Sequence, residues 1–191
     1  AVTAPSKELS FADYVKSTRT QLHDVLSTRR FTQEERPFGG YNIDQVVNMR
    51  APFAMTPDAA SCDAAGRDLA HGEKVGFLMI HGLTDSPFWL SDVRDHLRSR
   101  FPCATFHGVL LPGHGTVPGD LIDARLEDWL ETARYGVDAF GADIEHIIPI
   151  GYSMGAALIG RDFDARKQDK RINGMIMLSP GLTAKSKQAW L

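Results

Sequence analysis

The chain has 191 residues, of which 43% are hydrophobic and 24% charged, with a formal net charge of -3 and a sequence pI near 6.2. Such a length and balance are typical of one globular domain with its own hydrophobic core. The slightly acidic charge offers no basic field for displacing counterions, so we expect no nucleic-acid partner. Because no apolar run approaches the roughly 20 residues that span a bilayer, we also expect no transmembrane segment.

The start of the sequence leaves the cellular location open. Residues 1–6 contain neither an initiator Met nor an apolar signal core. They fit either the start of a mature exported protein or an arbitrary starting point. Between a periplasmic or secreted location and a cytoplasmic one, we favour export.

Cys62 and Cys103 are the only cysteines. In a reducing compartment they would be idle thiols, and in an oxidising one they can pair. Cys103 opens a predicted strand and Cys62 lies in the connection before another, so we expect both near the amino ends of adjacent parallel strands and able to form a disulfide. Neither belongs to a Cys-x-x-Cys or Cys/His cluster, so no metal site is predicted.

We interpret residues 1–74 as an N-terminal extension and residues 75–191 as the core. In the extension, helical spacing of apolar residues predicts a helix from Glu8 to about Thr28, with Ser10 as a candidate cap. Residues 41–74 are rich in Pro, Ala, Asp and Gly. They are interpreted as loops with one or two short outer strands around Val46–Met55.

Apolar strands alternate with amphipathic helices throughout the core. The predicted strands are Val75–Ile80, Cys103–Val109, Ile147–Gly151 and Gly174–Leu178; the predicted helices run from Pro87, over Leu126–Phe140 and from Met154 to about Lys167. This alternation predicts an α/β fold that is doubly wound, with a mostly parallel sheet covered by helices on both faces. Pro149 lies inside a predicted strand, where we expect a bulge or a missing ladder bond.

Gly151-Tyr152-Ser153-Met154-Gly155 matches the pattern Gly-x-Ser-x-Gly between a strand and a helix. The pattern alone also fits a plain glycine-rich turn, but this context favours a nucleophile elbow. Such a turn is so tight that glycines are needed on both sides of the serine, whose hydroxyl is exposed above the sheet. Ser153 is therefore the candidate nucleophile, and the helix N-terminus beside it favours developing negative charge.

Two further motifs follow the first two core strands, His81-Gly82-Leu83 and Leu111-Pro112-Gly113-His114-Gly115. With the elbow, and in this order, the chain from about Val75 to Gly181 resembles the α/β-hydrolase family, in particular its bacterial carboxylesterase and monoacylglycerol-lipase branch. The resemblance implies an oxyanion hole made by the backbone amides of Leu83 and Met154. It also implies that His81 and His114 hold loops, and that no metal or organic cofactor takes part.

A serine hydrolase also needs a histidine base and an acid, which this family carries after the nucleophile. All seven histidines precede Ser153, namely His23, His71, His81, His96, His107, His114 and His146. The acids after it, Asp162, Asp164 and Asp169, fall on or just beyond the helix that leads away from the site. We therefore expect that the chain stops before the strands that carry the acid and the histidine, and that residues 1–191 alone are inactive.

The resemblance thus implies a serine hydrolase that cleaves a small-molecule ester or lipid through an acyl-serine intermediate. The alternative is a naturally short, non-catalytic form that binds acyl compounds or serves as a scaffold for a protein partner. Because fold does not fix substrate, the acyl and alcohol groups stay open. The oligomeric state is open as well.

Overall fold

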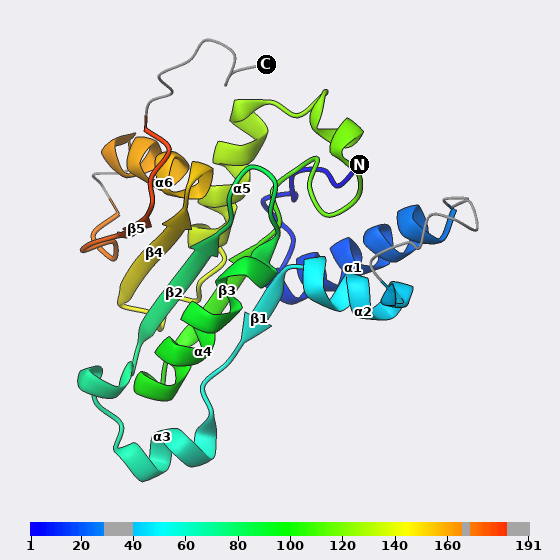
Figure 1. Cartoon of the computed structure of the whole chain (residues 1–191). Helices are drawn as coiled ribbons and strands as arrows, with labels where there is room; N and C mark the ends of the chain where they lie inside the picture. The colour runs from blue at the N-terminus through cyan, green and yellow to red at the C-terminus, as the bar shows by residue number, and fades with distance from the viewer. Residues whose placement is uncertain (29–39, 166–168, 183–191) are drawn as a thin grey trace.

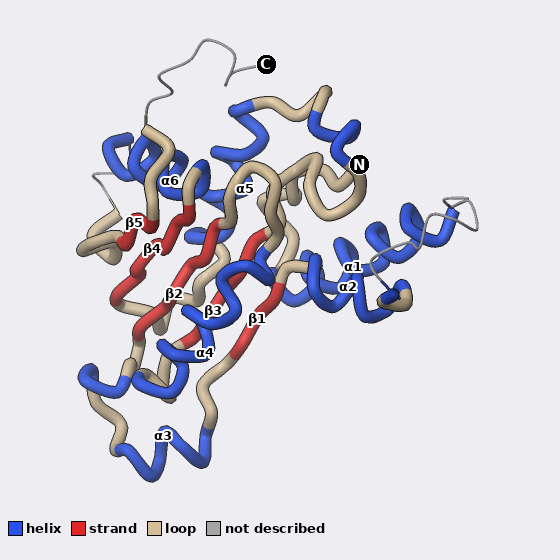
Figure 2. The backbone as a smooth tube through the Cα atoms, viewed as in Figure 1, coloured by secondary structure: helices blue, strands red, loops and turns tan. Residues whose placement is uncertain are grey.

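The computed structural model describes residues 1–28, 40–165 and 169–182. Within these ranges a central sheet has the strand order β1-β3-β2-β4-β5. The strands are β1 Phe53–Met55, β2 Val75–Ile80, β3 Thr105–Val109, β4 His146–Tyr152 and β5 Ile176–Leu178. Strands β2 to β5 run parallel, and β1 adds an antiparallel edge through β3 (Figures 1 and 2). The predicted α/β class with a mostly parallel sheet is confirmed.

Helices cover both faces of the sheet. The helices are α1 Phe11–Thr28, α2 Ile43–Arg50, α3 Ala59–Ala65, α4 Ser91–Arg100, α5 Leu126–Asp138 and α6 Met154–Ala165; α2 packs against α1, and α3 lies beyond the amino ends of β2 and β3 (Figure 1). Leu78 and Ile80 of β2 pack against α1, α5 and α6, whereas Phe77 and Met79 face Leu90 and the side of α4. Both faces of β2 are therefore buried, which explains its uninterrupted apolar sequence. In the described ranges, no helix combines the length and apolarity needed to cross a bilayer.

The segment before β1 is a helix, so the expected strands around Val46–Met55 were wrong except at β1. Asn42 begins α2 with a capping box, in which its side chain accepts from the Gln45 amide and Gln45 accepts from the Asn42 amide. The adjacent Val46 and Val47 are both buried against α1, a pattern that a helix accommodates and a one-sided strand does not. The division between residues 74 and 75 stays a prediction, and β1 shares the sheet with the core strands.

Pro149 is accommodated without a bulge on the β2 side, whereas on the other side residues 148–149 lie opposite residues 173–175, one residue more. The register between β2 and β4 is continuous from Val75↔His146 to Ile80↔Gly151. On the other side, Ile147 donates its amide to the Arg171 carbonyl, but strand pairing with β5 begins only at Ile150. The ladder is thus interrupted beside Pro149, and the expected missing bond is confirmed.

Two long-range contacts tie the N-terminal 74 residues to the core strands. The Tyr14 hydroxyl of α1 donates to the Leu110 carbonyl and accepts from the Leu110 amide, both at 3.0 Å, just beyond β3. Cys62 of α3 and Cys103 form a disulfide with a Cα–Cα distance of 4.9 Å, so the predicted proximity is confirmed. The two cysteines are 41 positions apart in the sequence. In the chain-entropy model, a disulfide that closes a loop of this length raises the free energy of unfolding by about 4 kcal/mol.

Candidate active site

Ser153 lies at the turn between β4 and α6, with a left-handed backbone at φ 51°. A Cβ on Gly155 would come within 2.2 Å of the Ile80 carbonyl oxygen, and one on Gly151 within 2.4 Å of the Ala156 amide nitrogen. Only glycine fits either position, because both obstacles are backbone. The two flanking glycines therefore permit a turn that presents the serine at the carboxyl end of β4, as the sequence pattern predicts.

The loop after β2 lies directly beside this turn. The register Ile80↔Gly151 aligns the ends of the two strands, and a Cβ on Gly82 would lie 3.4 Å from Ser153 Cβ. Leu83, the next residue, has a side chain that is 46% exposed above this edge. The structure therefore brings the two segments with the predicted oxyanion amides, Leu83 and Met154, to the ends of adjacent strands.

Backbone hydrogen bonds to the segment around β5 hold the turn that contains Ser153. The Ser153 amide donates to the Leu178 carbonyl at 2.9 Å, and the Gly181 amide donates to the Ser153 carbonyl at 3.1 Å. The residues that follow β5 thus fix the backbone of Ser153 from the side away from β2. Its conformation is set by neighbours on both sides, which is how a sparsely populated φ persists in a folded protein.

His81 and His114 connect the loops around the turn. His81 Nε2 accepts from the Leu111 amide at 3.1 Å, while its Nδ1 lies 2.8 Å from the Gly82 carbonyl oxygen. His114 Nε2 lies 2.5 Å from the Leu83 carbonyl oxygen. Both rings are buried and hold the loops that follow β2 and β3, in agreement with the role expected from the sequence.

His81 is suited to this role and not to proton transfer at Ser153. Burial, and then the neighbouring His114, lower the pKa of His81 to about 3. A neutral ring can donate from Nδ1 to Gly82 and accept at Nε2 from Leu111, so both ring nitrogens are occupied.

All seven histidines are described, and none of the hydrogen bonds among the described residues joins an imidazole ring or a carboxylate to the Ser153 hydroxyl. The Asp85 carboxylate lies near Ser153, because Asp85 Oδ2 and Ser153 Cβ would lie 2.5 Å and 3.4 Å from the same Cβ on Gly82. Asp162 Oδ1 lies 2.6 Å from Arg134 Nε, and Asp169 pairs with Arg171. The side chain of Asp164 lies outside the described residues.

A hollow of about 270 Å³ opens beside Leu83. Trp89 and Leu121 contribute apolar lining, and Arg50 and Asp85 contribute charge. Arg50 Nη1 donates to the Gly115 and Thr116 carbonyls, and partial burial lowers the pKa of its guanidinium. Sequence reasoning missed Arg50 and Trp89 as lining residues, because α2 was expected to be strand and no motif marks either position.

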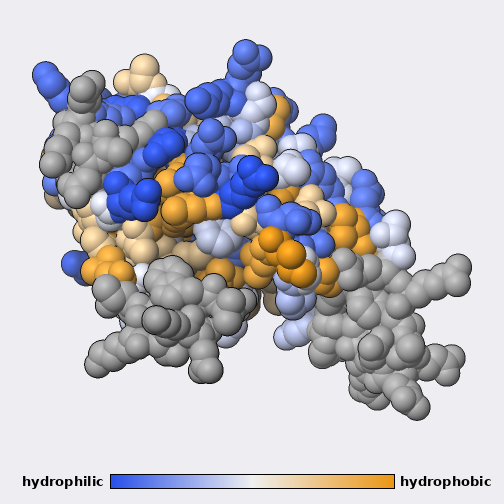
Figure 3. All heavy atoms as spheres, turned by 90° about the horizontal axis from the view of Figure 1, so that it is seen from above, coloured by the Kyte–Doolittle hydropathy of each residue, from blue (hydrophilic) through white to orange (hydrophobic). Residues whose placement is uncertain are grey.

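Apolar side chains gather on this face of the molecule. Viewed from above the carboxyl ends of the parallel strands, hydrophobic surface (orange) lies among hydrophilic groups (blue) in Figure 3. Trp89 and Phe88 are 68% and 49% exposed, and Ile122 is 84% exposed. Such a concentration of exposed apolar surface is typical of a binding face.

The comparisons with known proteins agree with this fold. The model of the Alpha/beta hydrolase family matches residues 77–190. A structure reported for LipS and LipT, two metagenome-derived lipolytic enzymes, is similar at 21% identity and a TM-score of 0.51, covering 72% of this chain and 48% of that one.

Two other structures are less similar. A thioesterase domain from the curacin biosynthetic pathway has 20% identity and a TM-score of 0.49, over 62% of this chain and 43% of that one. The Francisella virulence factor BioJ has 17% identity and a TM-score of 0.44, over 95% and 56%. The chain thus spans about half the length of the first structures it matches. No curated protein matches it.

Proposed function

Because the chain belongs to the alpha/beta hydrolase family, we propose that the protein cleaves carboxylic esters through an acyl-serine intermediate on Ser153. The observation that carries the proposal is the backbone of Ser153, held at φ 51° between two glycines that no other residue can replace. A serine in such a turn is a costly arrangement, and it has a chemical use when the hydroxyl must be presented to a substrate.

In the proposed reaction, Ser153 Oγ attacks the ester carbonyl carbon while its proton passes to a base. The amides of Leu83 and Met154 donate to the oxyanion of the tetrahedral intermediate, and one such donor contributes about 3–4 kcal/mol. The N-terminus of α6 adds a favourable dipole. The alcohol leaves with a proton as its C–O bond breaks, and water then hydrolyses the acyl-serine.

The base and the acid come, in this proposal, from the whole protein outside residues 1–191. The pairing of Asp162 with Arg134 and of His81 with the loop backbone supports this, because both groups are engaged elsewhere. The hollow beside Leu83 would receive one part of an ester or lipid substrate against Trp89 and Leu121. The proposed chemistry uses neither a metal nor an organic cofactor.

The test is covalent labelling of the whole protein with a fluorophosphonate probe. We expect one label on the wild type and none on Ser153→Ala. Ser99→Ala, at an exposed serine of α4, is the matched control and should label like the wild type. Equal labelling of wild type and Ser153→Ala would overturn the assignment. No label on the wild type, with retained binding of acyl compounds, would favour the non-catalytic alternative.

A further inference from the structure

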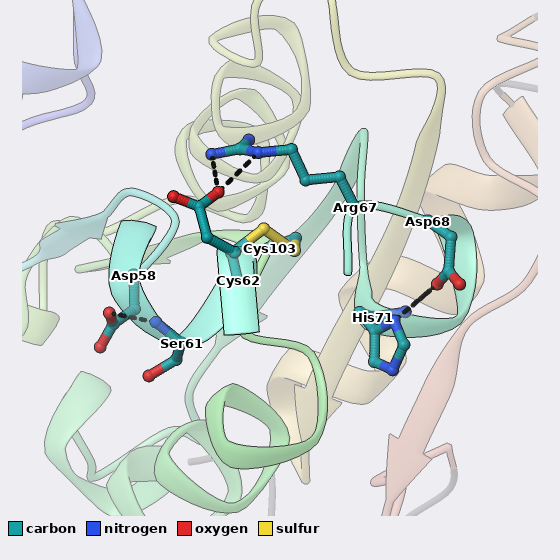
Figure 4. The surroundings of a disulfide bond; sticks show 8 residues. Asp58, Ser61, Cys62, Arg67, Asp68, His71 and Cys103 are labelled. Carbon is teal, nitrogen blue, oxygen red and sulfur yellow. Dashed lines mark hydrogen bonds and ion pairs between the residues drawn. A yellow bond between two sulfur atoms is a disulfide. The ribbon is translucent and has the colours of Figure 1, made fainter. Parts of the chain in front are cut away.

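The end of the sheet opposite Ser153 carries a second cluster of reactive side chains. Cys62 of α3 is fully buried and Cys103, two residues before β3, is 4% exposed. Figure 4 shows the disulfide between them. The two sulfurs and a carboxylate oxygen of Glu73 all lie within 4.8 Å of one another. We call these three residues the Cys62–Glu73–Cys103 cluster.

Glu73 is the unusual member of the cluster. Its Oε2 is buried and accepts no hydrogen bond, although leaving a buried carboxylate oxygen without a donor is destabilising. A disulfide has no hydrogen to give it. Two thiols would supply donors, and a cation bound to two thiolates would supply a positive charge. The position of Glu73 is thus explained by the reduced pair and not by the oxidised one.

We propose that the reduced Cys62–Glu73–Cys103 cluster binds a zinc ion, and that the disulfide and the metal site are mutually exclusive states of the same residues. A dithiol or phosphine reductant supplies two electrons, and two protons complete the thiols. Zinc then displaces both thiol protons and binds two thiolates and the Glu73 carboxylate, with water in the fourth position. Thiolate and carboxylate ligands in this number suit zinc.

The backbone holds the three ligands where such a site needs them. Asp58, which caps α3, donates its amide to the Pro102 carbonyl, so the helix carrying Cys62 is tied to the residue before Cys103. The Cys103 amide donates to the His71 carbonyl, and the Glu73 amide donates to the Asp68 carbonyl. The turn bearing Glu73 is therefore fixed against the start of β3 before any metal arrives.

The change of geometry between the two states is small. With zinc–sulfur distances of about 2.3 Å, tetrahedral thiolates lie about 3.8 Å apart. The Cα–Cα distance of 4.9 Å permits this separation through side-chain rotation. Glu73 already lies within 4.8 Å of both sulfurs and needs to approach by about 1 Å to bind the same ion.

The surroundings of the cluster are of mixed charge. Residues 58–74 contain four acids and two bases. A surface hollow of about 770 Å³ is lined by Ser61 and Pro102, the residues next to the two cysteines, and also by Arg98 and Arg100. His71 Nδ1 lies 2.7 Å from Asp68 Oδ1 and is therefore engaged outside the cluster.

The test uses the protein reduced with a phosphine and titrated without oxygen. We expect calorimetry to give one zinc ion bound by the reduced protein and none by the oxidised one. Cobalt should give thiolate charge-transfer absorption in the reduced protein alone. Zinc should also raise the unfolding temperature of the reduced form only, because it binds that folded state.

Variants distinguish zinc binding by all three residues of the Cys62–Glu73–Cys103 cluster from zinc binding by the two thiols alone. Glu73→Gln should weaken zinc binding at least about tenfold, as loss of even an outer partner does. Asp63→Asn, which changes a nearby carboxylate that pairs with Arg67 and is not a ligand, should weaken zinc binding far less than Glu73→Gln does. If the reduced protein unfolds, zinc should restore its cooperative transition. Absence of zinc binding or of that restoration, or equal affinity in Glu73→Gln, overturns the proposal.

Discussion

His107 should make the fold sensitive to acid. The ring lies in β3 between Phe11 and Phe140, with ring centroids 3.7 Å and 4.0 Å away, and its Nδ1 is buried without a hydrogen-bond partner. Burial lowers the pKa of His107 from 6.5 to about 4, and a backbone hydrogen bond with Gly136 offsets part of that effect. A charged ring in this stack would have no water and no anion to stabilise it.

The sign and size of the effect follow from linkage. As pH falls through 6.5 the unfolded chain takes up a proton on His107, whereas the folded chain stays neutral until about pH 4. The contribution to the free energy of unfolding is therefore present above pH 6.5 and is lost on acidification. Between pH 7.5 and pH 5 we expect a loss of about 2 kcal/mol from His107. The pKa of His81 is lowered too, and it adds a loss of the same sign.

The substitution His107→Phe isolates the contribution of His107 to the pH dependence of the free energy of unfolding. A phenylalanine ring is planar and apolar, so it preserves the ring stack but cannot titrate. Urea unfolding followed by tryptophan fluorescence gives the free energy of unfolding at each pH. The variant should lose about 2 kcal/mol less than the wild type between pH 7.5 and pH 5, whatever its stability at neutral pH. His96→Gln, at an exposed histidine of α4, is the control for replacing a histidine. Identical pH dependence in His107→Phe and wild type would refute the reasoning.

Two further predictions concern the site. Gly155→Ala should prevent soluble folding or lower the free energy of unfolding by about 3 kcal/mol or more, because the added Cβ would lie 2.2 Å from the Ile80 carbonyl oxygen. The control Gly119→Ala, where a Cβ would lie in open space, should change the free energy of unfolding little. Wild-type stability in Gly155→Ala would contradict the tight elbow. Residues 1–191 alone should hydrolyse p-nitrophenyl butyrate no faster than their Ser153→Ala variant, because every histidine precedes Ser153. Turnover at the rate of the whole protein would identify one of those histidines as the base.

Local sequence patterns were sufficient to predict the parallel strands. The apolar run Val75–Ile80 predicts a strand that is buried on both faces. The glycines on either side of Ser153 predict a tight turn, so each feature can be predicted from neighbouring residues alone. Even the proline at position 149 gave a correct expectation, since a missing amide must leave a gap in one ladder. The helix α2 was missed, because Asn42 and Gln45 act as a capping box only when the chain between them is helical.

Features that depend on long-range contacts were beyond local patterns. Arg50 lines the hollow only because α2 docks beside the loop containing Gly115. Glu73 reaches the two cysteines only because the turn after α3 is tied to the start of β3. In both cases partners are set by tertiary packing and not by spacing along the sequence.

The bond pair between Tyr14 and Leu110 has a consequence for the order of folding. One phenol satisfies both backbone groups of a residue 96 positions later, at the point where β3 gives way to the loop containing His114. Until α1 docks, that amide and carbonyl have no protein partner and the loop lacks its anchor. Contacts of such sequence separation close late, because the chain entropy is lost before they form. The loop that begins at Leu110, at the same edge of the sheet as Ser153, should therefore become fixed after the sheet, when the first helix of the chain docks.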